Sequence, residues 1–278
     1  MKSYLNLGCG PRFCSGWTNI DFVSSHPEVI AHNLRLGIPY PSDTFELAYH
    51  SHVLEHFAKA DAPNFLMECR RVLRPGGILR VVVPDLESIA SAYLRALDLA
   101  SSGNEGWDYN YEYVILELYD QAVREHAGGA LRDYLDQRTI PNIDFVLERG
   151  GTEIRNIIDE AERRRNRTAN EYGSGDLTRR AYGFLRRTRF GWEMLLRLLL
   201  GKEYEVLQLG RFRKYGEPHL WMYDRYSLSK LLSEAGFRDV RVFSPTESYI
   251  ADWAGFNLDT ELDGSVYKPH SLYVEGRK

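Results

Sequence analysis

A short run of the chain, HSHVLEH, gathers three histidines and one glutamate that could carry acid–base or metal chemistry. His52 and His56 are the first candidates for a general base, because an imidazole titrates near neutral pH and can accept a proton. His126, in the distant run YDQAVREHAGG, is a third candidate. For Glu55 and His56 the alternative is structural, a capping and packing role in the turn that follows the histidines.

The same run could also belong to a metal site of the metallo-β-lactamase type. That pattern is H-x-H-x-D-H, whereas HSHVLEH carries an additional residue. The rest of the chain offers no clear later set of ligands. The sequence therefore predicts no metal ion, and metal-dependent hydrolysis is kept only as a distant alternative.

The strongest local signal is LNLGCG at residues 5–10, where an apolar strand runs directly into a Gly-x-Gly turn. Glycine allows the backbone to approach a ligand closely. A dinucleotide site would also need a third glycine, a helix facing a pyrophosphate and an acid about 20 residues further on. Here Pro11 and Arg12 follow, and the first acid is Asp21. We expect a ligand without a pyrophosphate, with a plain tight turn as the alternative.

Polar residues follow the next strands in the same way. Asp21 closes the second strand, and its carboxylate could accept hydrogen bonds from both hydroxyls of a ribose or cap the next turn. Asn33 follows the third strand; its amide could pair with the edge of adenine while Leu34 packs on the ring, or it could be a loop residue. The fourth strand ends at His50 and Ser51, at the switch point where such sheets open a ligand crevice.

Alternating strand and helix patterns must position these residues. Five apolar runs between residues 2 and 85 read as strands, and residues 60–73 read as a helix before the fifth strand. A second helix over 226–235 precedes two more strands. The runs are YLNL, WTNI, EVIA, FELAYH, ILRVVVP, VRVF and SLYVEG. They predict an α/β fold with a seven-stranded, mostly parallel sheet and helices on both faces.

Residues 89–215 have a different character, with helical runs rich in Tyr and Arg. We interpret them as a helical insertion after strand five that caps the acceptor site, so that the sheet domain comprises 1–88 and 216–278. Residues 163–214 hold fourteen basic and five acidic side chains. An anionic substrate, a membrane surface and simple solvation compete as explanations, and the apolar run FGWEMLLRLLL adjoins the basic stretch.

Composition narrows the class of protein further. A net charge of −4 and a pI near 6.1 give the chain no overall attraction to phosphate backbones, so no nucleic acid partner is expected. Three cysteines without CxxC spacing argue against a disulfide framework and favour a reducing cytoplasm. The sequence shows no export signal or membrane span. The oligomeric state stays open.

Taken in order, these motifs resemble the class I, Rossmann-like methyltransferases of the type 11 group. LNLGCG resembles the glycine motif of that family, NIDF its ribose acid and HNL its adenine position. IPYPSDTFELAYHSHVLEHF resembles its fourth-strand block, CRRVLRPGGILRVVVPD its helix and fifth strand, and LSKLLSEAGFRDVRV its late helix and sixth strand. Together these segments cover roughly half the chain.

The resemblance implies a methyltransferase with S-adenosylmethionine as its cofactor. The basic, Tyr-rich insertion favours a small or glycan-type acceptor, either sugar-bearing or anionic, and we expect transfer to oxygen. A sensor or assembly subunit that binds the cofactor without transfer is the alternative. The resemblance also implies a set of cofactor contacts in three parts: the methionyl part, the ribose, and the adenine with the fourth-strand edge. These are Gly8, Cys9 and Gly10; Asp21 with Phe22; and Asn33 and Leu34 with His50 and Ser51.

Overall fold

The computed structural model describes residues 3–170 and 183–278, with side chains described outside 167–191 and 215. Seven strands form one sheet in the order β3-β2-β1-β4-β5-β7-β6. Their bounds are β1 Tyr4–Leu7, β2 Thr18–Asp21, β3 Val29–Ala31, β4 Phe45–Ser51, β5 Leu73–Pro84, β6 Arg238–Phe243 and β7 Ser271–Arg277. The seven-stranded sheet expected from the sequence is confirmed.

One strand alone runs against the rest. β7 pairs antiparallel with both β5 and β6, whereas the pairs among β1 to β5 are all parallel. The order is that of a doubly wound sheet, 3-2-1-4-5-6, with one antiparallel strand inserted before the last. The sheet is therefore mostly parallel, as predicted, and it opens its crevice where β1 and β4 lie side by side.

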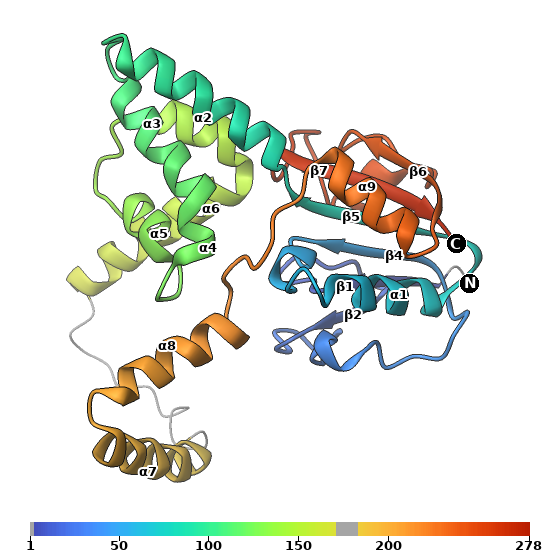
Figure 1. The fold of residues 1–278 in the computed structure, drawn as a ribbon, viewed down its shortest axis with the longest axis horizontal. Helices are drawn as coiled ribbons and strands as arrows, with labels where there is room; N and C mark the ends of the chain where they lie inside the picture. Colours follow the sequence, from blue (N-terminus) through green and yellow to red (C-terminus); the bar gives the residue numbers. More distant parts are fainter. Residues whose placement is uncertain (1–2, 171–182) are drawn as a thin grey trace.

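Helices cover one face of this sheet (Figure 1). α1 (Ala62–Val72) and α9 (Arg225–Glu234) bury Leu66 and Leu228 in one core with Leu79 of β5. Asp224 begins α9, because its carboxylate accepts hydrogen bonds from the backbone N–H groups of Tyr226 and Ser227.

The opposite face carries loop segments in the described residues, so the prediction of helices on both faces is wrong. The short 3₁₀ turn η5 (Trp253–Phe256) packs there, and Trp253 joins a second core with Tyr49 and Tyr273. The connection from β1 to β2 spans only residues 8–17 and winds through turns, which leaves no room for a covering helix.

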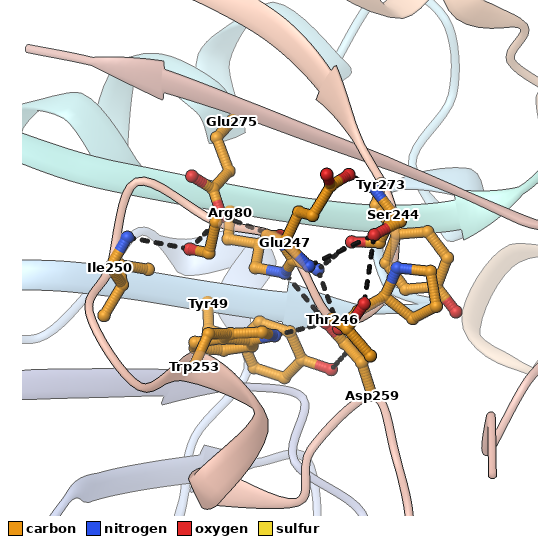
Figure 2. Close-up of polar contacts among 12 residues, drawn as sticks. Tyr49, Arg80, Ser244, Thr246, Glu247, Ile250, Trp253, Asp259, Tyr273 and Glu275 are labelled. Carbon is orange, nitrogen blue, oxygen red and sulfur yellow. Dashed lines mark hydrogen bonds and ion pairs between the residues drawn. The ribbon is translucent and has the colours of Figure 1, made fainter. Parts of the chain in front are cut away.

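A buried arginine fastens this loop segment to the sheet (Figure 2). Arg80 of β5 is fully buried; its Nε lies 2.8 Å from Asp259 Oδ2 and its Nη1 lies 2.6 Å from Glu275 Oε1. Its guanidinium also donates to the backbone oxygens of Glu247 and Ser244. Two carboxylates and several carbonyls therefore compensate the positive charge of Arg80. A buried charge is stable only when it is paired and hydrogen-bonded in this way.

The chain between β5 and α9 is largely helical. Its first part forms a lobe beyond the carboxyl end of β5, in green and yellow in Figure 1, with a core of its own around Tyr113, Leu135 and Val146. The lobe consists of α2 (Leu86–Ser101), α3 (Trp107–Ile115), a π-helical turn (Leu116–Asp120), α4 (Gln121–Val123), α5 (Gly129–Leu135) and α6 (Ile143–Asn170). α6 is kinked at Gly151, which has a left-handed φ of 59°.

The second part is a helical pair, α7 (Gly183–Leu200) and α8 (Glu203–Tyr215), that extends away from the sheet (Figure 1). Glu193 of α7 accepts hydrogen bonds from Tyr204 and Arg211 of α8. The apolar side chains of Leu198 and Leu199 remain exposed. Part of the basic stretch noted in the sequence, 171–182, lies outside the described residues. In the part of the chain that the structure describes, no helix is long and apolar enough to cross a membrane.

Candidate functional site

The turn after β1 has the backbone that its glycines suggest. Gly8 and Gly10 have φ values of 63° and 53°, in the left-handed region. The N–H groups of Gly8 and Cys9 both donate to the carbonyl of Ile20, which ties the turn to β2. A Cβ at Gly8 would lie 2.3 Å from Val53 Cγ2, so the turn also needs glycine for space.

Asp21, at the end of β2, holds the same turn. Its Oδ2 accepts a hydrogen bond from Gly10 N at 2.7 Å, and its Oδ1 accepts a longer one from Val23 N at 3.3 Å. The carboxylate is therefore placed beside the glycine turn, where the sequence expected a ribose ligand. Its contact with a ribose stays a prediction.

A cavity of about 210 Å³ opens beside this turn, and we call it the turn cavity. It contains five of the residues singled out in the sequence: Gly8, Cys9, Gly10, Ser51 and His52. Its other lining residues are Asn6, Pro11, Arg12, Tyr49, Glu153, Leu258, Tyr267 and Lys268. The cavity thus brings the carboxyl ends of β1 and β4 together with α6 and the segment before β7.

Five expected cofactor contacts lie outside that lining: Asp21, which reaches it only through Gly10, and the four described next. His50 is fully buried with its ring against Phe65, because successive side chains of a strand point to opposite faces and Ser51 takes the cavity side. Phe22 is 66% exposed. Asn33 caps the 3₁₀ turn η1 (Leu34–Leu36) by accepting from the following N–H groups, and Leu34 lines a separate cavity against α1.

A second cavity, of about 90 Å³, lies between the helical lobe and the sheet, and we call it the lobe cavity. His52, Glu153 and Lys268 line both cavities. The remaining lining is mixed polar and apolar: Pro84, Ile89, Tyr113, Glu117, Gln121, Leu131, Arg149, Gly150, Ile154, Pro269, His270 and Ser271. The two cavities therefore adjoin at three charged or titratable side chains.

His52 is fixed at this junction by its backbone and its ring. Its φ of 55° is left-handed, and its N–H donates to Val82 O at 2.9 Å. Its Nε2 lies 3.0 Å from Ser271 Oγ, and its Nδ1 lies 3.5 Å from Glu55 Oε1. Burial, followed by the nearby Lys268 ammonium, holds the pKa of His52 well below its usual value.

The other two histidine candidates are placed differently. His56 lies outside the lining of both cavities, and its Nδ1 lies 3.2 Å from Pro218 O. His126 also lies outside them; its side chain is 62% exposed and its nearest charged partner is Asp133 at 3.9 Å. His126 is therefore positioned on the surface of the lobe rather than in the site.

Several residues of the site carried no signal in the sequence. Lys268 Nζ lies 2.9 Å from Glu153 Oε1, which joins the segment before β7 to α6. Arg12 stacks 3.8 Å from the centre of the Tyr267 ring and pairs with Glu261. These contacts join segments more than 100 residues apart, so no local pattern in the sequence predicts them.

Comparison with known proteins agrees with this arrangement. Residues 18–81, from β2 into β5, match the family model described as the methyltransferase domain. A stretch of 48 residues is 44% identical to a protein of Aspergillus luteorubrus described as "Probable methyltransferase ltbC". It covers 17% of this chain and 17% of that protein, so the chain spans about a sixth of the curated relative that it matches.

Two solved structures are among those found to be similar. A SAM dependent methyltransferase from Archaeoglobus fulgidus is 10% identical, with a TM-score of 0.37, over 100% of this chain and 86% of the other. An S-adenosylmethionine dependent methyltransferase from Mesorhizobium loti is 15% identical, with a TM-score of 0.37, over 99% and 90%. At these low TM-scores the two structures are no evidence for the fold, which is assigned from the strand order.

Proposed function

Starting from the class I, Rossmann-like methyltransferase domain that the chain carries, we propose that the protein transfers a methyl group to a hydroxyl of a small or glycan-type acceptor. S-adenosylmethionine is the cofactor that this domain implies, and it supplies a methyl group on a positively charged sulfur. The observation that carries the proposal is the meeting of the turn cavity and the lobe cavity at His52.

The residues of the turn cavity fit the implied cofactor. A Cβ at Gly10 would meet nothing within 4 Å, so open space borders the backbone of the turn. Asp21 places a carboxylate at the same turn, and a carboxylate accepts hydrogen bonds from sugar hydroxyls. We assign Gly8, Cys9, Gly10 and Asp21 to cofactor binding on this basis.

The lobe cavity suits an acceptor rich in hydroxyl groups. Glu117, Gln121 and Arg149 offer hydrogen-bond donors and acceptors, and the aliphatic Ile89 and Leu131 lie among them. Arg149 and Lys268 are each paired with a glutamate, so the cavity does not present a bare positive charge. This favours a neutral, sugar-like acceptor over the anionic one that the basic sequence suggested.

His52 is the residue that we assign to the acceptor proton. It is the only histidine that lines both cavities among the residues that the structure describes, and a base must reach the proton that it abstracts. Alignment of acceptor and methyl group, and exclusion of water by the lobe, supply the remainder of the rate.

The test has two steps. Calorimetry should detect binding of S-adenosylhomocysteine and no binding of NAD. Mass spectrometry after incubation with S-adenosylmethionine and a panel of glycans should then detect a product 14 Da heavier, about one CH₂. His52→Gln should retain cofactor binding and lower the rate by about 10²–10⁴-fold, the usual contribution of a positioned base.

His126→Ala is the matched control, because that histidine lies on the surface, and it should leave the rate unchanged. Cofactor binding without transfer to any hydroxylated acceptor would favour the sensor or assembly subunit instead. Equal rates for His52→Gln and the parent protein would remove His52 from the chemistry.

A further inference from the structure

Behind His52, away from the two cavities, three metal-ligating side chains converge. Glu55, His56 and His219 each offer one ligand atom, and these atoms all lie within 4.8 Å of one another. Glu55 Oε1 lies 3.9 Å from His219 Nε2. The cluster joins the 3₁₀ turn η2 (Leu54–His56) to a segment more than 160 residues later in the chain.

The backbone holds these two segments in register. The N–H groups of Leu220 and Trp221 both donate to the carbonyl of Glu55, at 2.7 and 3.2 Å. His219 N donates to Gln121 O at 2.8 Å, which anchors the same segment to the lobe. The cluster is therefore positioned by main-chain contacts and does not depend on long, mobile side chains.

No hydrogen bond satisfies the buried carboxyl group of Glu55 among the described residues. It is fully buried, and neither of its oxygens has a hydrogen-bond partner among the described residues. An unpaired carboxylate in the protein interior costs several kcal/mol of stability. Proteins avoid this cost by pairing the carboxylate with a cation or by coordinating a metal ion with it.

His56 is oriented as a metal ligand usually is. His56 Nδ1 lies 3.2 Å from the Pro218 carbonyl, so it carries the proton and its Nε2 is left free to bind. Such a hydrogen bond from the second ring nitrogen to a carbonyl is typical of metal-bound histidine.

We propose that Glu55, His56 and His219 bind a divalent first-row transition metal ion. Two imidazole nitrogens and one carboxylate suit Zn²⁺, Mn²⁺ or Fe²⁺ better than Mg²⁺, which prefers an all-oxygen environment. Three protein ligands leave at least one coordination position open. His52, whose Nδ1 lies 3.5 Å from Glu55 Oε1 and which lines both cavities, stands between the ion and the acceptor site.

An ion at this position would act beside the junction of the cavities. Bound to Glu55, it would fix the carboxylate that lies 3.5 Å from His52 Nδ1 and so help to orient that imidazole toward the acceptor proton. That role rests on the proposed function, whereas the binding site itself does not.

The experiment measures metal binding alone. The full chain is stripped with EDTA, dialysed, and titrated with Zn²⁺ and, separately, with Co²⁺, whose visible absorption reports its coordination. We expect one equivalent of either metal per chain. Glu55→Gln and His219→Ala should each weaken binding by at least about tenfold, since even outer-shell partners of a metal site contribute 10–100-fold. His126→Ala, which removes an exposed histidine, should bind as the parent chain does.

Two further measurements keep the result unambiguous. Calorimetry with S-adenosylhomocysteine verifies that each variant is folded, independently of metal. X-ray absorption on the Zn²⁺-loaded parent chain should detect imidazole nitrogen at about 2.0–2.1 Å, whatever happens to the variants. Failure of the parent chain to bind one equivalent, variants that bind as tightly as the parent, or a Zn²⁺ shell without imidazole would each overturn the site. None of these outcomes would affect the transfer assay on His52→Gln.

Discussion

Individual residues at the glycine turn are constrained by more than one neighbour. Asp21 was expected as a ligand, yet one of its oxygens accepts a hydrogen bond from Gly10 N. The same carboxylate can therefore shape the turn and contact a ribose with its remaining lone pairs. A change at this position should act on the cofactor through both effects.

For Asp21→Ala we expect a loss of about 1.5–3 kcal/mol of affinity for S-adenosylhomocysteine, the scale of hydrogen bonds to a charged group. Calorimetry gives the affinity directly. Asp133→Ala is a suitable control, because the Asp133 side chain is 72% exposed and far from the turn in the sequence. Unchanged affinity of Asp21→Ala would move the ribose acid to another residue.

Gly8→Ala should be more harmful than Gly16→Ala. Both glycines have left-handed φ values, 63° and 81°, so alanine strains the backbone at either position. Only at Gly8 would the added Cβ also lie 2.3 Å from Val53 Cγ2, whereas at Gly16 it meets nothing within 4 Å. Overpacking costs a further 1–3 kcal/mol, roughly. Urea denaturation of the two variants measures the difference, and equal destabilisation would contradict the argument.

At the scale of elements, the sheet depends on charges buried beneath a loop. Arg80→Met would leave Asp259 and Glu275 buried without their cation, so we expect a loss of about 3–5 kcal/mol in the free energy of unfolding. Arg74→Met is the matched control in the same strand. Arg74 pairs with Glu46 at the surface and should cost less than about 1 kcal/mol. Similar midpoints in chemical denaturation for the two variants would show that the network adds little.

The order of elements could be predicted from the sequence because strand and helix periods are local. The runs YLNL and FELAYH mark β1 and β4, and Gly236 follows α9 near its predicted end. The antiparallel direction of β7 could not be predicted in this way, since direction depends on long-range pairing with β5.

The same distinction between local patterns and long-range contacts applies to the residues of the site. Gly8, Gly10 and Ser51 could be found because they follow strands directly. Lys268, Glu153 and Arg80 could not, because each acts through a partner far away in the chain. His50 was expected to contact the cofactor but packs against Phe65, because neighbouring side chains of a strand point to opposite faces of the sheet.

At the scale of the whole molecule, the turn cavity is closed by parts of the chain that lie far apart. Residues 8–12 come from the sheet domain, Glu153 from α6 and Lys268 from the segment before β7. A ligand that contacts all of them binds the assembled arrangement only and stabilises it by mass action. The lobe and the sheet should therefore respond together to the cofactor.

Hydrogen exchange measured by mass spectrometry can test this coupling. With saturating S-adenosylhomocysteine we expect slower exchange in residues 8–12, near Glu153 and near Lys268. α8 (Glu203–Tyr215), which lines neither cavity, serves as the internal reference and should exchange at the same rate with and without ligand. Protection confined to residues 8–12 would mean that the lobe does not participate in binding.

The position of β7 has a consequence for biosynthesis. β7 lies between β5 and β6, yet it follows both of them in the chain. While a ribosome is still making the chain, the apolar run Leu79–Val83 of β5 therefore has one unpaired edge, and Glu275 is not yet present to meet Arg80. Unpaired edges of this kind are prone to aggregation. The nascent chain can complete its sheet only after synthesis has passed Arg277, so one edge of β5 stays unpaired until then.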